Sequence, residues 1–380
     1  MSVPEIHGEV APPFEKLRAV FAANFETQHE IGAALCVYHQ GNKVVDIWGG
    51  HRDGAQSQPW QEDTLVNVWS TTKGAMAACV ARLVSQKRLD LSKPVAEYWP
   101  EFAASGKENI TVAQLFSHQA GLCGPVEKLT VDDVYDVTKI ADGLAAQPPQ
   151  WEPGTRSGYH AITIGYLAEA LVSRITGQSV GEYFQAEIAG PLGLDMFLGL
   201  PEAEEGRVAE MLHDGNPMSG GIETYNEYQI LAQVNVPVAF ELANQRRWRA
   251  MGIPSAGGSA TARGIAAMYN ALIDDVRGTT ETISDQATLR QMLSCQIKNE
   301  DLVIRFPMTW GVGFALDDGS GMYGGGAKSF GHHGWGGSYG FADPEAGLAF
   351  SYAMNFMREP QSEDTRAINL MQALYSAVQQ

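Results

Sequence analysis

The sequence is poor in positive charge and in long apolar runs. Its 380 residues hold 26 Lys and Arg against 44 Asp and Glu, a formal net charge of -18. This charge repels phosphate backbones and anionic lipids, so we expect no nucleic-acid or membrane partner. No run approaches the roughly 18 apolar residues of a membrane span, and the first residues lack the pattern of an export signal. These features predict a cytoplasmic protein.

Cysteine and metal-binding motifs are also scarce. The sequence has four cysteines, none in a C-x-x-C pair: Cys36, Cys79, Cys123 and Cys295. Most sit in apolar runs, which indicates small buried side chains in a reducing compartment. There is no H-E-x-x-H motif, and the adjacent His332 and His333 would point to opposite faces of a strand. We therefore expect neither a catalytic metal nor a cofactor.

Strand patterns lie near both ends of the chain, and helical patterns lie mainly between them. Apolar periodicity predicts helices over residues 13–28, 70–84, 161–177, 261–276 and 365–378. Strand-like runs cover residues 31–40, 43–50, 64–69, 310–316, 338–343 and 347–355, with a tight turn at Gly41 and Asn42. The order predicts an α+β fold in which an antiparallel sheet is flanked by N- and C-terminal helices.

The chain has no long linker, so we expect one catalytic unit over residues 1–380. An α/β lobe would comprise residues 1–69 and 261–380, and a mainly helical lobe would be inserted as residues 70–260. The boundary between such lobes is a favourable place for a ligand cleft. The oligomeric state is left open.

Ser70 and Lys73 lie where the second helical pattern begins. Residues three apart share one face of a helix, so the Lys73 amine can approach the Ser70 hydroxyl. The positive end of a helix also favours a developing oxyanion, and a desolvated lysine becomes a better proton acceptor. Alternatively, Ser70 caps the helix and Lys73 is a solvated first-turn residue.

Several blocks in order resemble the serine β-lactamase and penicillin-binding-protein superfamily, and most closely the family VIII carboxylesterases. Besides "STTK", they are "LDLSKPVAEYWPEF", "ITVAQLFSHQAGL", "WEPGTRSGYHAITIGYLAEAL", "GPLGLD" and "FGHHGWGGSYGFADPEAGLAFSYAMN". The resemblance covers nearly the whole chain. It implies a β-lactamase-like fold and an acyl-enzyme formed on Ser70 with the help of Lys73.

The resemblance also indicates a partner base. The family's second motif, Tyr-x-Asn or Ser-x-Asn, matches Tyr159-His160-Ala161, in which the tyrosine is kept and the asparagine is lost. By this resemblance Tyr159 is a general base whose pKa we expect a nearby lysine ammonium to lower. Without the family context, the favoured interpretation of Tyr159 is a core tyrosine whose hydroxyl is hydrogen-bonded.

The third family motif, Lys-Thr-Gly on the edge strand, matches His332-His333-Gly334, so a permanent positive charge is missing. The resemblance implies that this lysine serves the substrate carboxylate, so its loss favours uncharged esters. A backbone N–H at or beside Trp335 would be the second oxyanion donor after that of Ser70. The two histidines are alternatively ordinary strand residues. The remaining candidates for substrate binding are Trp69, Trp151, Gly336 and Tyr339.

Two other motifs compete with this interpretation. Gly336–Gly340 reads G-x-S-x-G, but the segment after Ser338 contains Pro344 and Gly347, which oppose the helix that a nucleophile elbow requires. Residues 321–329 are one residue away from a phosphate-binding loop, but no helical pattern follows them.

The sequence thus predicts a carboxylesterase that cleaves short-chain esters, with weak side activity on β-lactams. An acyltransferase that uses the same acyl-enzyme is the nearest alternative. A β-lactamase or DD-peptidase, or a catalytically inactive ligand-binding protein on this scaffold, also stays open.

Overall fold

Nine antiparallel strands form the main sheet. The computed structural model describes residues 3–215, 222–358 and 364–379. In sheet order the strands are β1 (Ile6–Val10), β3 (Asn42–Gly50), β2 (Gly32–His39), β13 (Leu348–Met354), β12 (Tyr339–Asp343), β11 (Phe330–His333), β10 (Ala315–Leu316), β9 (Pro307–Trp310) and β8 (Ile297–Glu300). The sheet therefore joins residues from both ends of the chain, as expected.

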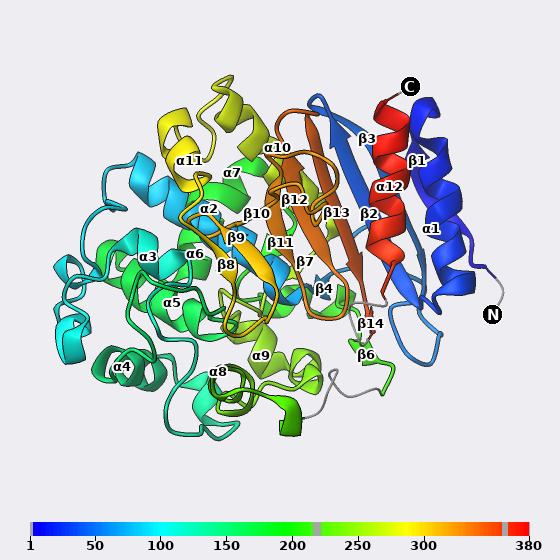
Figure 1. Cartoon of the computed structure of the whole chain (residues 1–380). Coiled ribbons are helices and arrows are strands. Elements are labelled where there is room, and N and C mark those ends of the chain that lie inside the picture. Colours follow the sequence, from blue (N-terminus) through cyan, green and yellow to red (C-terminus); the bar gives the residue numbers. More distant parts are fainter. Residues whose placement is uncertain (1–2, 216–221, 359–363, 380) are drawn as a thin grey trace.

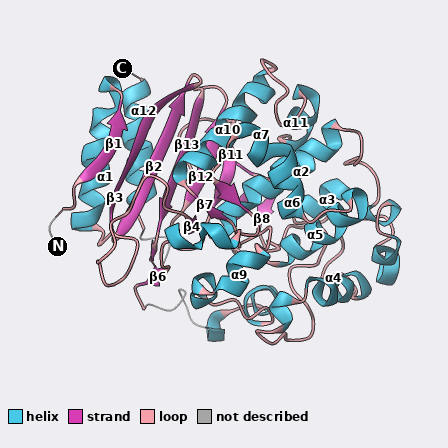
Figure 2. Cartoon of the chain, turned by 180° about the vertical axis from the view of Figure 1, so that it is seen from behind, coloured by secondary structure: helices cyan, strands magenta, loops and turns pink. Residues whose placement is uncertain are grey.

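Helices cover both faces of this sheet. On one face α1 (Glu15–Thr27) and α12 (Arg366–Val378) pack side by side, and α10 (Ala262–Arg277) lies against the central strands on the other face (Figures 1 and 2). α1 buries Leu17, Phe21 and Phe25, the apolar positions that predicted it. The predicted α+β class with an antiparallel sheet and terminal helices is confirmed.

Most of the remaining helices lie between β3 and α10 in the sequence. They are α2 (Lys73–Ser85), α3 (Val112–Phe116), α4 (Val137–Ala146), α5 (Thr163–Thr176), α6 (Val180–Phe184), α7 (Gly190–Leu192), α8 (Glu227–Gln229) and α9 (Arg246–Met251); α11 (Gln286–Met292) follows α10. α5 ends at Gly177, which has a φ of 79°, as its sequence predicted. The exact bounds of the two lobes stay a prediction.

Two small sheets lie outside the main one. β4 (Val66–Asn67), β7 (Ser259–Ala260) and β5 (Met196–Phe197) form one, and β6 (Leu212–His213) pairs with β14 (Phe356–Met357) in the other. Only two residues of the strand expected over 64–69 are extended. Among the described residues, none of the helices has the length and apolar character that a membrane crossing requires.

The structure corrects two local expectations. In the β2–β3 hairpin the two residues with positive φ are Gln40 (50°) and Gly41 (79°), whereas Asn42 already belongs to β3. In α2, side chains are buried on every face from Lys73 to Ala81 rather than along one stripe. Its many small residues let neighbouring elements approach closely on all sides.

Candidate active site

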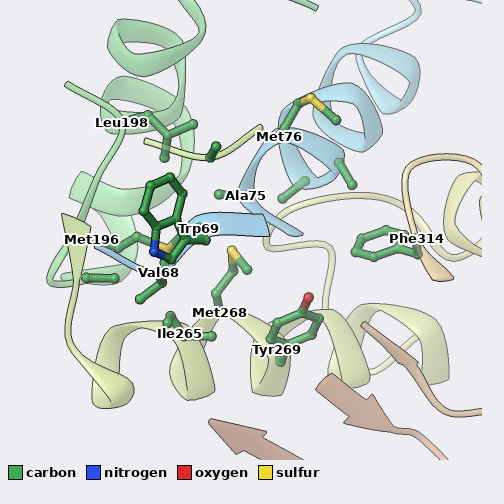
Figure 3. Close-up of a cluster of buried hydrophobic side chains, with 14 of the residues drawn as sticks. Val68, Trp69, Ala75, Met76, Met196, Leu198, Ile265, Met268, Tyr269 and Phe314 are labelled. Carbon is green, nitrogen blue, oxygen red and sulfur yellow. The ribbon is translucent and has the colours of Figure 1, made fainter. Parts of the chain in front are cut away.

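Ser70 lies in a strained turn between β4 and α2. The turn is a short 3-10 helix, η2 (Trp69–Thr72), and Trp69 has a φ of 46°, which is unfavourable for so bulky a residue. The Trp69 indole fixes this conformation by packing in the core. Figure 3 shows it beside Val68, Met196 and Leu198, with Ile265 and Met268 projecting from α10. The strained turn leaves Ser70 partly exposed, within the 3-10 helix that leads into α2.

The main sheet approaches the Ser70 turn through a glycine. A Cβ atom on Gly334 would lie 2.3 Å from the Val68 carbonyl oxygen and 2.2 Å from Ser338 Oγ, so a larger residue would separate the two elements. Ser338 donates to the Val68 carbonyl at 2.8 Å, and its Oγ lies 3.0 Å from Thr71 Oγ1. Ser338 is therefore a buried bridge between β12 and the turn.

Lys73 places its amine against the Ser70 hydroxyl. Nζ lies 2.9 Å from Ser70 Oγ, 2.7 Å from the Ala161 carbonyl oxygen and 2.8 Å from the Ser255 carbonyl oxygen. Desolvation by burial holds the pKa of Lys73 well below its usual value. A neutral amine has two N–H groups and one lone pair, and the two carbonyls can only accept. In that form the lone pair is directed at Ser70, whose O–H can donate to it.

Ala161 occupies the position at which the family motif has an asparagine. Its backbone carbonyl contacts Lys73 Nζ, so the main chain supplies an oxygen beside the amine although the side chain is only a methyl group. The lost asparagine therefore does not leave Lys73 without partners.

Tyr159 lies on the other side of the Ser70 hydroxyl. Its side chain is hydrogen-bonded to Ser70, and Lys73 Nζ lies 4.8 Å from the centre of its ring. Burial raises the pKa of the Tyr159 phenol, with a smaller opposing effect from the Ser70 hydrogen bond. This is opposite to the expected direction, because removing a phenolate from water costs more than the hydrogen bond with Ser70 returns.

The two histidines lie at the end of β11. β10 pairs only with Phe330 and Gly331 of this strand, so β11 is internal in the sheet but its last two residues extend past β10. This corrects the expected edge strand. His332 donates through Nε2 to the Gly313 carbonyl at 3.1 Å, and burial holds its pKa well below the usual value.

His333 lies beside two tyrosines. Its Nδ1 is 3.4 Å from the Tyr323 hydroxyl, and its ring stacks on Tyr339 with centroids 5.4 Å apart. Burial lowers the pKa of His333 to about 4. Both histidines are therefore neutral near pH 7 and do not replace the missing positive charge.

A cavity of about 390 Å³ opens at Ser70. Its wall is mainly apolar and aromatic. The lining residues include Trp69, Tyr159, Ile162, Tyr225, Val236, Val238, Ile304, Met308, Trp310, Tyr323, His332, His333 and Trp335. Among the described residues that line it, none is Lys, Arg, Asp or Glu.

Three of the candidate binding residues lie outside this lining. Trp151 packs against Gly158 and donates its indole N–H to the Arg156 carbonyl at 2.9 Å. The Gly336 carbonyl accepts from Arg366 at 2.9 Å. Tyr339 stands behind His333.

Sequence reasoning missed Trp310, which stacks on Tyr159 with ring centroids 5.5 Å apart and an interplanar angle of 5°. It was seen only as part of a strand-like run. No motif marked it, because its contact with Tyr159 depends on how β9 lies beside the loop before α5.

The other motifs do not form sites. Residues 321–329 lie in the connection between β10 and β11, and a strand rather than a helix follows them. Within the described ranges, no group of three or more His, Cys, Asp or Glu side chains is arranged to hold a metal ion. All four cysteines are unpaired, and three of them are buried.

A buried amine lies beside a partly exposed serine where a helical region meets an antiparallel sheet, an arrangement typical of hydrolases that use a serine nucleophile. Residues 17–375 match the Beta-lactamase family, and the chain belongs to this family.

Proteins with sequences similar to this chain include esterases. The chain is 34% identical over 381 residues to Esterase/beta-lactamase LipL of Mycobacterium tuberculosis, covering 93% of this chain and 84% of that protein. It is 30% identical over 397 residues to Esterase EstB of Burkholderia gladioli, covering 95% of each. Among solved structures, a family VIII carboxylesterase superimposes with a TM-score of 0.91 at 42% identity, covering 98% of this chain and all of the other.

Proposed function

We propose that the protein is a carboxylesterase that hydrolyses neutral esters through an acyl-enzyme on Ser70. The observation that most directly supports this proposal is the 2.9 Å contact between Ser70 Oγ and Lys73 Nζ. The two other partners of Nζ are carbonyl oxygens. Similarity to named esterases over nearly the full chain supports the same conclusion.

In the acylation step, Ser70 Oγ attacks the ester carbonyl and its proton passes to the neutral Lys73 amine. The directions of the two pKa shifts favour Lys73 over Tyr159 as this acceptor, because a protonated phenol cannot take another proton. Tyr159 then donates its phenolic proton to the departing alkoxide and is reprotonated from Lys73. In deacylation a water molecule follows the reverse route, and the acid is released.

The oxyanion would be stabilised by backbone N–H groups. We assign one to Ser70 at the start of α2 and one at or beside Trp335. Removing one such donor typically costs about 2.7 to 4 kcal/mol of transition-state stabilisation.

The cavity wall favours an uncharged substrate. No cation among the described lining residues can pair with a carboxylate, and His332 and His333 are neutral near pH 7. Short-chain alkyl esters fit the apolar wall. One relative is named an esterase and β-lactamase, so we propose a weak side activity on β-lactams.

The partner of this site is a small-molecule ester, and the net charge of -18 disfavours nucleic acid. We also propose a cytoplasmic location. The four unpaired cysteines support it, since a reducing compartment keeps thiols free.

The test compares Ser70→Ala with Ser338→Ala on a short p-nitrophenyl ester. Activity should be lost in the first and kept in the second, and a fluorophosphonate adduct should map to Ser70. The reverse pattern would overturn the assignment, and absence of acid product from the unaltered protein would favour a ligand-binding role. Added alcohols that yield mainly new esters would indicate an acyltransferase.

A further inference from the structure

A buried carboxylate lies beneath the tyrosine of the site. Asp301 follows β8, is fully buried, and is not among the residues that line the cavity. Unpaired carboxylates are rarely buried, because removal from water disfavours the charge unless several donors surround it. The groups that donate hydrogen bonds to Asp301 therefore indicate which segments this side chain holds in place.

One carboxylate oxygen of Asp301 accepts hydrogen bonds from three backbone N–H groups. Oδ1 accepts from the Tyr159 N–H at 2.9 Å and from the Val303 and Ile304 N–H groups at 3.0 Å each. The first of these amides belongs to the candidate general acid, and the other two belong to residues that line the cavity.

The second carboxylate oxygen accepts hydrogen bonds from two side chains. Oδ2 accepts from the Ser157 hydroxyl at 2.8 Å and from Trp310 Nε1 at 3.3 Å. Ser157 immediately precedes the Tyr159 loop, and Trp310 is the ring that stacks on Tyr159. One carboxylate therefore binds the backbone of Tyr159, the Trp310 indole that stacks on the Tyr159 ring, and the backbone of one cavity wall.

We propose that Asp301 is a positioning residue that orients Tyr159 toward Ser70 and sets the cavity wall at Val303 and Ile304. The inference rests on the proposed function, since it assigns Asp301 a role only through Tyr159 and the acyl site.

The chain contains a matched control. Asp275 is equally buried and accepts from the backbone N–H groups of Thr282, Ile283 and Ser284 and from the Thr280 hydroxyl, away from the cavity. Asp275→Ala therefore removes a similar set of hydrogen bonds. It should reduce thermal stability about as much as Asp301→Ala but leave kcat within about twofold, because local loss of packing far from the site changes stability rather than chemistry.

The test is a double-mutant cycle with Tyr159→Phe, measured on a p-nitrophenyl ester below the unfolding temperature of every variant. Asp301→Ala should lower kcat on the order of 10²-fold, since small misplacement of a reacting group has effects of this size. In the Tyr159→Phe background the same change should alter kcat by less than about twofold, because the phenol that it positions is gone, whereas displacement of the wall at Val303 and Ile304 would appear in KM. Asp301→Asn keeps an oxygen for the three amides and should recover most of the loss.

Equal effects of Asp301→Ala in both backgrounds, or effects that match those of Asp275→Ala, would overturn the inference. If Asp301→Ala does not fold, Ser157→Ala replaces it. A several-fold loss of kcat that disappears with Tyr159→Phe supports the proposal, and an equal loss in both backgrounds refutes it. These outcomes are separable from failure of the proposed function, which would appear as activity retained in Ser70→Ala.

Discussion

Replacing Lys73 by Met should separate the catalytic from the structural effect of a buried amine. The Met side chain keeps similar length but cannot take the Ser70 proton. A positioned general base contributes on the order of 10² to 10⁴-fold in rate, so kcat/KM should fall by at least this much. The measurement is initial-rate hydrolysis of a short p-nitrophenyl ester, with a fluorophosphonate to count the reactive Ser70.

Two opposing terms set the stability of this variant. The carbonyls of Ala161 and Ser255 lose a donor, at about 1–3 kcal/mol for each buried group left unpaired. Against this, removing the amine relieves the cost of taking it out of water, which is the cause of the lowered pKa of Lys73. Because the two effects oppose each other, the free energy of unfolding near pH 7 should change far less than the activity does.

Lys107 provides the control. It is also buried, its Nζ donates to the backbone carbonyls of Ala104 and Gln147, and burial lowers its pKa, yet it lies away from the cavity. Lys107→Met should alter stability by a comparable amount and leave kcat/KM unchanged. Equal loss of activity in both variants, or full activity in Lys73→Met, would refute the role assigned to Lys73.

The same amine predicts two pH dependences. The folded-state pKa of Lys73 lies below its unfolded value of about 10.4, so the unfolded chain binds the extra proton between the two values. Stability should therefore rise with pH across this interval, and Lys73→Met should remove that contribution. Activity should fall as the pH drops through the folded pKa, because a protonated Lys73 cannot accept the Ser70 proton.

Three further substitutions test the phenol of the site, the cavity wall and a buried arginine that stabilises the fold. Tyr159→Phe should lower kcat on the order of 10²-fold or more with little change in KM, measured by steady-state kinetics; an unchanged kcat would exclude the phenol from proton transfer. Val238→Trp should fill part of the cavity and raise KM for longer acyl chains more than for acetate, measured over a chain-length series; a uniform change would show that acyl chains bind elsewhere. Arg366→Met leaves the buried carboxylates of Glu30 and Asp364 without their cation, so the free energy of unfolding should fall by about 3–5 kcal/mol in thermal or denaturant unfolding. A fall of less than about 1 kcal/mol would contradict the structural role of Arg366.

The sequence predicted the parts of the site that depend on short-range geometry. The spacing of Ser70 and Lys73 on one helical face follows from the helix repeat alone, and the structure places their side chains 2.9 Å apart. Tyr159 was found only through family resemblance, because nothing in its local sequence separates it from a core tyrosine.

Features that depend on burial or on contacts between distant segments were not predictable. The direction of the Tyr159 pKa shift follows from desolvation of the phenol, and this depends on elements far away in the sequence. Trp151 and Trp310 have the same side chain, but only the second faces the cavity. The carbonyl of Ala161 beside Lys73 is invisible to any motif, because every residue type carries one.

The packing of α1 against α12 has a practical consequence for handling the protein. Both helices cover the face of the sheet opposite α10, and the two chain ends lie at opposite ends of this helical layer, away from α2 (Figure 1). A surface tether or a fused partner attached at either end would hold the molecule with its substrate entrance unobstructed.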